Sequence, residues 1–214
     1  GEILMRLHTF FRSSAAYRVR IALNLKGVPC EMMPVHLRRS EQHADAYRKL
    51  SPMGLVPTLE DGGAVINQSM AIIQYLEETY PTPSLLPDNP ADRAHVRAIA
   101  FTIACDIHPL QNLRVLQYLM RNVGLTQEQT DEWFRHWVSQ GLLAVEQMVK
   151  PKSGKFCFGD DPGLADVCLV PQLANARRVN TDLSQMPTLL RIEENCQALE
   201  AFQRAAPSAQ ADAE

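Results

Sequence analysis

The stretch FFRSSAAYRVRIALNLKG, residues 10–27, carries the first helical pattern of the chain. Apolar side chains recur in it at helical spacing, and Gly27 is typical of the residue at which a helix ends. Two serines, Ser13 and Ser14, stand between arginines just before this pattern, with Arg12 next to them. They suit two roles, because a hydroxyl there either caps the helix or helps to hold an anion at its positively polarised end. The stretch alone leaves both roles open.

Strand and helix patterns alternate around this helix. They predict a strand at 3–9, a strand at 28–35 with Pro34 suited to a sheet edge, a short helix at 40–50 begun by Ser40, a hairpin of 55–61 and 64–67, and a helix at 69–80 capped by Ser69. The resulting β-α-β-α-β-β-α order predicts an α/β thioredoxin-like N-terminal domain. Periodicity by itself leaves other small α/β sandwiches open.

A proline-rich segment, PTPSLLPDNPADR at 81–93, cannot continue a helix and predicts an interdomain linker. Beyond it the pattern is helical at 91–122, 126–149, 164–179 and 187–205. We therefore expect a thioredoxin-like domain at 1–82, a linker at 83–90 and an all-α domain at 91–214.

Two local features of the helical part carry further expectations. Pro171 should kink or restart the helix at 164–179, because proline cannot donate to the preceding turn. The tail APSAQADAE, residues 206–214, is small and polar and is expected to fray.

Composition excludes several classes of function. The chain of 214 residues has a formal net charge of −3, which argues against a general nucleic-acid binder, and no apolar run reaches membrane-spanning length. The five cysteines form no C-x-x-C pair and the histidines show no metal-binding spacing, so neither a metal site nor a dithiol site is predicted. The absence of a leader pattern and the unpaired thiols lead us to expect a cytoplasmic protein.

Several motifs together resemble one family. They are RSSAAYRVRIALNLKGV, LVPTL, QSMAIIQYLEE, YPTPSLLP, IHPLQNLRVLQYL, GDDPGLADVCLVPQLANARR and LEAFQRAAP. In this order they resemble the zeta-class glutathione transferases over nearly the whole chain. The resemblance implies a glutathione transferase architecture, glutathione as cofactor and a homodimer. One departure stands at Ala15, where many members of the family have cysteine, so activation of a thiol would depend on serine and the helix end.

The resemblance assigns catalysis to Ser13, with Ser14 assisting. It assigns glutathione binding to residues of both domains, namely Ser13, Gln42, Val56, Pro57, Gln68, Ser69, His108 and Asn112. Each of these has a plainer alternative: a serine that caps a helix, a proline in an edge strand, or a solvated polar side chain. The bond between Val56 and Pro57 is a candidate cis peptide, at which a bound peptide can pair like an added strand.

A dicarboxylate substrate needs positively charged side chains to hold it beside a thiolate. The resemblance assigns this role to Arg12, Arg114 and Arg178, with Arg177 easily confused with Arg178. Taken one at a time, each arginine could equally be an ordinary charged residue on the protein surface. Asp166, three residues after Gly163, is expected to serve folding through half of a capping box, since glycine offers no hydroxyl.

The activity that the resemblance implies is the glutathione-dependent cis–trans isomerisation of maleylacetoacetate to fumarylacetoacetate. Three motifs, SS, PLQNL and PQLANA, favour this substrate, while isomerisation of maleylpyruvate and a general transferase activity stay open. A scaffold without activity is disfavoured because the serines, Val56-Pro57 and Gln68-Ser69 are all present. A thiol-disulfide oxidoreductase is disfavoured because the first helix begins with Ala15 and Ala16 where a cysteine would be needed.

Overall fold

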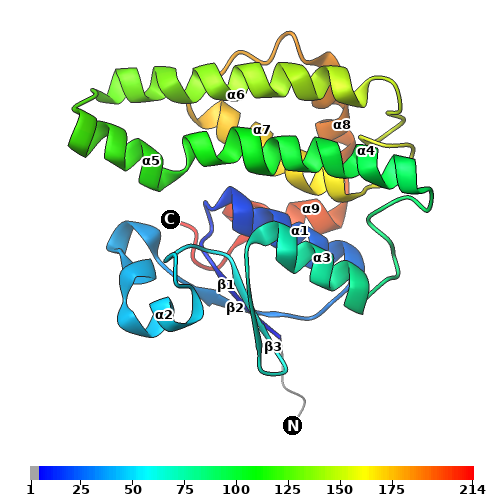
Figure 1. Ribbon diagram of the computed structural model, residues 1–214. Helices are drawn as coiled ribbons and strands as arrows, with labels where there is room; N and C mark the ends of the chain where they lie inside the picture. The colour runs from blue at the N-terminus through cyan, green and yellow to red at the C-terminus, as the bar shows by residue number, and fades with distance from the viewer. Residues whose placement is uncertain (1–4) are drawn as a thin grey trace. The chain divides into compact units, whose positions relative to one another are not determined.

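The computed structural model describes residues 5–214, which form two compact units (Figure 1). The first unit comprises the residues up to Leu85 together with Gln197–Glu214, and the second comprises Leu86–Cys196. The sequence predicts the same two kinds of domain but assigns residues 197–214 to the helical one. The structure differs there, because these residues pack with the sheet-bearing unit.

The first unit contains a four-stranded mixed sheet in the order β2-β1-β3-β4. Its strands are β1 (Arg6–Thr9), β2 (Glu31–Pro34), β3 (Thr58–Asp61) and β4 (Ala64–Asn67). β1 is parallel to β2 and antiparallel to β3, and β4 completes the predicted hairpin with β3. The predicted position of Pro34 at a sheet edge is confirmed, since β2 is an outer strand. Residues 3 and 4 of the predicted first strand lie outside the described residues.

Helices cover both faces of this sheet. Side chains alternate along a strand, so Leu7 and Leu59, which are paired across β1 and β3 and fully buried, point to one face. The next residue, His8, points to the other face and its ring lies 5.5 Å from the ring of Tyr47 in α2 (Asp45–Leu50). On the face opposite α2, α1 (Ser14–Lys26) and α3 (Ser69–Thr79) lie side by side (Figure 1). The mixed sheet with these helices confirms the predicted thioredoxin-like domain.

Two predicted helix starts in this unit are wrong in detail. Ser40 does not cap α2; it has a φ of 62° between two short 3-10 helices at Leu37–Arg39 and Glu41–His43, and Ala44 precedes α2. Ser69 is the first residue of α3 rather than its cap, and the capping position belongs to Gln68, whose φ is 72°. The end of α1 is as predicted, with Gly27 in the left-handed region at a φ of 64°.

The C-terminal segment is part of the first unit because it packs against α1. The helix α9 (Glu200–Ala205) accepts from Arg20 Nε at the carbonyl of Ala205 over 3.0 Å and from Asn24 Nδ2 at the carbonyl of Ala201 over 2.9 Å. The expectation that residues 206–214 fray is wrong, since Asp212 accepts a hydrogen bond from the backbone of Phe11.

The second unit is built from helices around an apolar core. They are α4 (Pro90–Phe101), α5 (Leu113–Tyr118), α6 (Gln127–Val149), α7 (Leu164–Arg178) and α8 (Pro187–Gln197). The single helical pattern at 91–122 is divided in the structure, with π-helical stretches at Thr102–Ile107 and Leu119–Val123 and a 3-10 turn at His108–Gln111. The division coincides with Pro109, which cannot continue the hydrogen bonding of a helix interior.

Two close contacts explain features of this unit. Gly141 of α6 lies against Ile107, where an added Cβ would stand 2.3 Å from the isoleucine side chain. Pro171 lies inside α7, which runs as one helix from Leu164 to Arg178 without the predicted restart. The residues around Pro171 are almost all buried, so tertiary packing holds the helix together where the local hydrogen bond is missing.

Candidate functional site

Ser13 occupies the N-cap of α1. Its φ is −69° and its ψ 114°, and its Oγ accepts a hydrogen bond from the backbone N–H of Ala16 over 3.1 Å. The capping role is therefore real, but it uses only the oxygen. In the described part of the chain, no acceptor is recorded for the hydroxyl hydrogen of Ser13, so that hydrogen can be donated to an anion. Ser14 is buried at the first position of the helix, which makes Ser13 the more accessible of the two hydroxyls.

A tight turn presents Ser13. The N–H of Ser13 donates to the carbonyl of Phe10 over 2.9 Å, which leaves Phe11 and Arg12 at the corner of the turn. Arg12 is half-buried, and within residues 5–214 its guanidinium has no recorded hydrogen bond or ion pair. Arg20, buried beneath the turn, donates to the carbonyls of Phe10 and Phe11 over 3.4 and 3.1 Å. The turn thus carries, directly before Ser13 in the chain, an arginine with no partner recorded among residues 5–214.

A buried arginine of α1 connects this helix to the N-terminus of α3. The sequence patterns do not single out this arginine. Arg18 is 2% exposed and donates from Nη1 to the Oγ of Ser69 over 3.2 Å. It is five residues after Ser13, or roughly 7 Å along the axis of α1. The available signal is an arginine within an otherwise apolar helical run, which is rarely buried unless it meets a partner. Positive charge therefore lies beneath the N-terminus of α3.

The segment before β3 contains backbone groups with no hydrogen-bond partner among the described residues. The peptide bond between Val56 and Pro57 is cis, as predicted. Neither the N–H nor the C=O of Val56 hydrogen-bonds to another residue of the described chain, whereas the carbonyl of Leu55 accepts from Tyr47 and Ser51. A buried group without a partner is costly, so this position is suited to an external peptide.

Gln42 shows a similar imbalance. The residue is 9% exposed, its Nε2 lies 3.4 Å from Nε2 of His43, and its Oε1 is buried with no partner among the described residues. Gln42 belongs to the short 3-10 helix before α2, where composition alone would place a surface residue. In the structure the side chain is instead buried, and its Oε1 remains available as an acceptor.

The predicted residues at the break after α4 form a local cluster of the helical unit. Asn112 caps α5, with its Oδ1 accepting from the N–H of Arg114 over 3.2 Å and its Nδ2 3.4 Å from Nε2 of His108. Arg114 is exposed. Beside them lies a buried amide pair, in which Gln111 donates to Oε1 of Gln172 over 2.8 Å. This pair fixes the break to α7.

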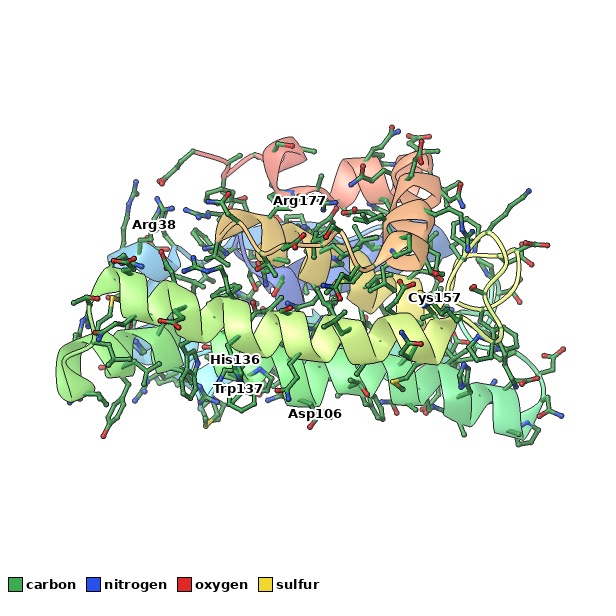
Figure 2. The ribbon with its side chains drawn as sticks, turned by 90° about the horizontal axis from the view of Figure 1, so that it is seen from above. Arg38, Asp106, His136, Trp137, Cys157 and Arg177 are labelled. Atoms are coloured by element: carbon green, nitrogen blue, oxygen red, sulfur yellow. The ribbon has the colours of Figure 1, made fainter. Side chains whose placement is uncertain are left out.

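The two adjacent arginines at the end of α7 bind different partners. Arg177, labelled in Figure 2, donates from both Nη atoms to the two carboxylate oxygens of Glu193 over 2.5 Å each. These hydrogen bonds to the Glu193 carboxylate raise the pKa of Arg177, so this pair stays ionised. Arg178 is exposed and donates to Oδ1 of Asn175 over 3.3 Å. Arg177 is therefore committed to holding α7 against α8.

Burial makes three thiols of this chain unsuited to nucleophilic attack. Cys157 lies at the C-terminal side of α6 (Figure 2), and burial raises the pKa of its thiol well above the ordinary value. Burial likewise raises the pKa of Cys196, and it raises that of Cys30 to about 12. Across residues 5–214, no group of three His, Cys, Asp or Glu side chains is placed to hold a metal ion. None of the helices there has the length and apolarity needed to cross a membrane.

Comparison with known proteins agrees with this geometry. Residues 7–84 match the model of the glutathione S-transferase N-terminal domain. A probable maleylacetoacetate isomerase of Vibrio cholerae is 48% identical over 209 residues, which cover 97% of each chain.

Solved structures resemble the whole chain. A maleylpyruvate isomerase, described as a bacterial zeta-class glutathione S-transferase, matches with a TM-score of 0.96 and 46% identity over 98% of this chain and 100% of the other. The maleylacetoacetate isomerase of Anaeromyxobacter dehalogenans, with dicarboxyethyl glutathione and citrate bound in its active site, matches with a TM-score of 0.90 and 42% identity over 100% and 99% of the two chains.

Proposed function

Because the chain belongs to the zeta-class glutathione transferases, we propose that it is a glutathione-dependent cis–trans isomerase acting on maleylacetoacetate. Its relatives carry the names of two isomerases, one for maleylacetoacetate and one for maleylpyruvate. The substrates share the maleyl end and differ in the group beyond it. The motifs around Ser13, Gln111 and Gln172 favour maleylacetoacetate, and maleylpyruvate is the alternative.

The residues of the first unit fit glutathione. The unpaired N–H and C=O of Val56 can pair with the backbone of the tripeptide, and the buried Oε1 of Gln42 can accept from its amides or ammonium group. The N-terminus of α3, with Ser69 and the buried charge of Arg18, suits the carboxylate of the γ-glutamyl end. Gln68 precedes this helix at a φ of 72°, and it makes no side-chain capping hydrogen bond to the helix, so its amide is available to the ligand.

When bound, glutathione supplies a thiolate that adds to the cis double bond and leaves again once the resulting single bond has rotated. The hydroxyl of Ser13 donates to the sulfur, and the free N–H groups at the start of α1 add positive potential. Both effects favour the charged form, which lowers the thiol pKa from its usual value near 8.5. Ser14 supports this end of the helix from its buried position.

The arginines hold the acidic ends of the substrate. Arg12 stands beside Ser13 with no competing partner recorded in the described chain, so it is the natural anchor for the carboxylate nearest the sulfur. Arg114 and Arg178 are exposed on the helical unit and are proposed as further anchors, with His108 and Asn112 contacting glutathione. The protein contributes orientation and electrostatics, and the reaction consumes neither glutathione nor an oxidant.

The observation that carries the proposal is the Ser13 hydroxyl, whose oxygen accepts from Ala16 while its hydrogen has no acceptor recorded within residues 5–214. Parallel assays of maleylacetoacetate and maleylpyruvate, with and without glutathione, test it. We expect turnover only with glutathione, a loss of about a hundredfold in Ser13→Ala and a smaller loss in Ser14→Ala. Turnover without glutathione, or full activity of Ser13→Ala while it still binds glutathione, would contradict the mechanism.

We also propose a cytoplasmic homodimer that binds neither nucleic acid nor membranes. Five free cysteines are consistent with a reducing compartment. Light scattering at micromolar concentration should give about twice the mass of the 24.0 kDa chain, and the mass of a single chain would contradict the dimer.

A further inference from the structure

The turn that presents Ser13 is held from outside by a residue near the other end of the sequence. Asp212 Oδ2 accepts the backbone N–H of Phe11 over 3.0 Å, a contact across 201 positions. On its other side, the carbonyl of Phe11 accepts from Arg20 Nη2 over 3.1 Å. Both hydrogen bonds involve a charged group and are therefore stronger than those between neutral partners.

The two charged groups also interact with each other. Burial lowers the pKa of Arg20 to about 10, and the negative charge of Asp212 acts in the opposite direction. The guanidinium therefore stays charged at neutral pH, and the carboxylate faces a permanent cation. The peptide groups at the corner of the turn are thus fixed between an anion and a cation.

The segment that carries Asp212 is itself anchored before this contact. Arg20 Nε donates to the carbonyl of Ala205 at the end of α9, so the same guanidinium holds both the turn and the start of the segment. Gln210 Nε2 then donates to the carbonyls of Arg204 and Ala206 over 2.9 Å each. These bonds direct residues 206–214 back toward α1.

The segment is anchored after the contact as well. Glu214 Oε1 lies 2.7 Å from Nε2 of His36, and its carboxylate also faces Arg38 and Arg39 at 3.5 and 3.6 Å. The ring of His36 lies 5.3 Å from the ring of Phe10, the first residue of the turn. Asp212 is therefore held in place from both sides.

We propose that Asp212 is a positioning residue, which orients the turn at Phe11 and so places the hydroxyl of Ser13 and the guanidinium of Arg12 for the reaction. The inference rests on the proposed function, since it assigns Ser13 to the thiol and Arg12 to the substrate. Rotation of the Phe11 peptide would displace both groups, because they follow within two residues. A displacement of about 1 Å is enough to cost a large factor in rate.

The test compares Asp212→Ala and Asp212→Asn with Glu200→Ala, a control in the preceding helix α9 whose side chain is 80% exposed. Two properties are measured: the kcat and KM of isomerisation, and the pKa of the bound glutathione thiol, followed by the ultraviolet absorbance of its thiolate. We expect Asp212→Ala to lower kcat by about tenfold and to raise the thiol pKa toward its free value. Asp212→Asn should recover most of both, because its amide oxygen still accepts from Phe11. Glu200→Ala should match the wild type.

If Asp212 had only a structural role, Asp212→Ala would lower the melting temperature and leave the thiol pKa and kcat unchanged. That result would overturn the proposal. Faster amide hydrogen exchange at residues 10–13 in Asp212→Ala supports it directly. If Asp212→Ala does not fold, the thiol titration of Asp212→Asn decides the question through a smaller shift in the same direction. If the wild type binds glutathione but isomerises neither substrate, the proposed function is refuted. The thiol titration and the hydrogen-exchange experiment would still test the positioning role of Asp212, because neither depends on turnover.

Discussion

Arg18 and Ser69 join the two helix starts of the sheet-bearing unit, because the buried guanidinium on α1 donates to the serine hydroxyl at the first position of α3 over 3.2 Å. In the proposed site, this one helix would contact two ends of a tripeptide. Its N-terminus would present Ser13 to the sulfur, and its second turn carries Arg18 beneath the position proposed for the γ-glutamyl carboxylate.

Arg18→Met should weaken glutathione binding. The substitution keeps the apolar stem but removes the charge and the donor to Ser69, so we expect the Kd for glutathione to rise by about tenfold, corresponding to about 1.4 kcal/mol. Isothermal titration calorimetry measures this directly. The matched control is Arg6→Met, since Arg6 is exposed and pairs only with the exposed Glu31 among the described residues. Equal affinities for both variants would contradict the assignment of Arg18.

A buried ion pair should make the folded state sensitive to acid. Lys26, whose side chain is fully buried, lies 2.7 Å from Glu77 and also donates to the carbonyls of Tyr80 and Pro83. Burial by itself would raise the pKa of Glu77, but hydrogen bonds from Lys26, Ser84 and the backbone outweigh it, so the pKa lies below 4.5. Because the folded pKa is depressed, this stabilisation is present above pH 4.5 and is lost as the pH falls through the folded value.

Urea unfolding from pH 7 down to pH 3 measures this loss. The wild type should lose free energy of unfolding below pH 4.5, and Glu77→Gln should be less stable at pH 7 by about 3 kcal/mol, because it leaves the charge of Lys26 without its counter-ion. The difference between the two proteins should shrink toward pH 3. A constant difference across this range would mean that the charge of Glu77 contributes nothing.

Much of the fold could be predicted because local patterns and tertiary packing agree there. The helix from Ser14 to Lys26 follows from its spacing and from Gly27, and the hairpin follows from its Asp61-Gly62-Gly63 turn. The positions of Ser40 and Ser69 were harder to predict, because several polar residues in a row can each serve as a cap. The path of residues 206–214 depends on partners about 200 positions away, and no local pattern contains that information.

The candidate site was predictable only in part, for a similar reason. Ser13 and the Val56-Pro57 bond are marked by motifs, and the structure adds the unpaired groups that give them a chemical use. Arg18, Gln172 and Asp212 act through contacts between distant segments, so their residue types alone suggest a surface or core position. Burial together with a polar partner distinguishes Arg18 and Gln172, and the hydrogen bond to the backbone of Phe11 distinguishes the half-buried Asp212.

Asp166 should contribute to stability and not to catalysis. Its buried carboxylate accepts from the N–H of Gly163 over 2.9 Å and from the N–H of Cys157 over 2.8 Å, which ties the start of α7 to the segment after α6. Asp166→Ala leaves two donors unsatisfied and should cost about 3 kcal/mol in the free energy of unfolding. Asp166→Asn keeps one acceptor and should cost less. Activity per folded molecule should match the wild type in both variants, and a selective loss of kcat would contradict a folding role.

The adjacent arginines of α7 should separate stability from substrate binding. Arg177→Ala leaves the buried carboxylate of Glu193 unpaired and should lower the free energy of unfolding by about 2 kcal/mol with little change in KM. Arg178→Ala should leave thermal stability near that of the wild type and raise KM for the maleyl substrate by about tenfold, because it removes a cation proposed to hold a carboxylate. Thermal denaturation and steady-state kinetics are measured on both variants, and each variant serves as the control for the other. The opposite pattern, with KM raised only in Arg177→Ala, would assign the substrate to Arg177 and contradict the role given to Arg178.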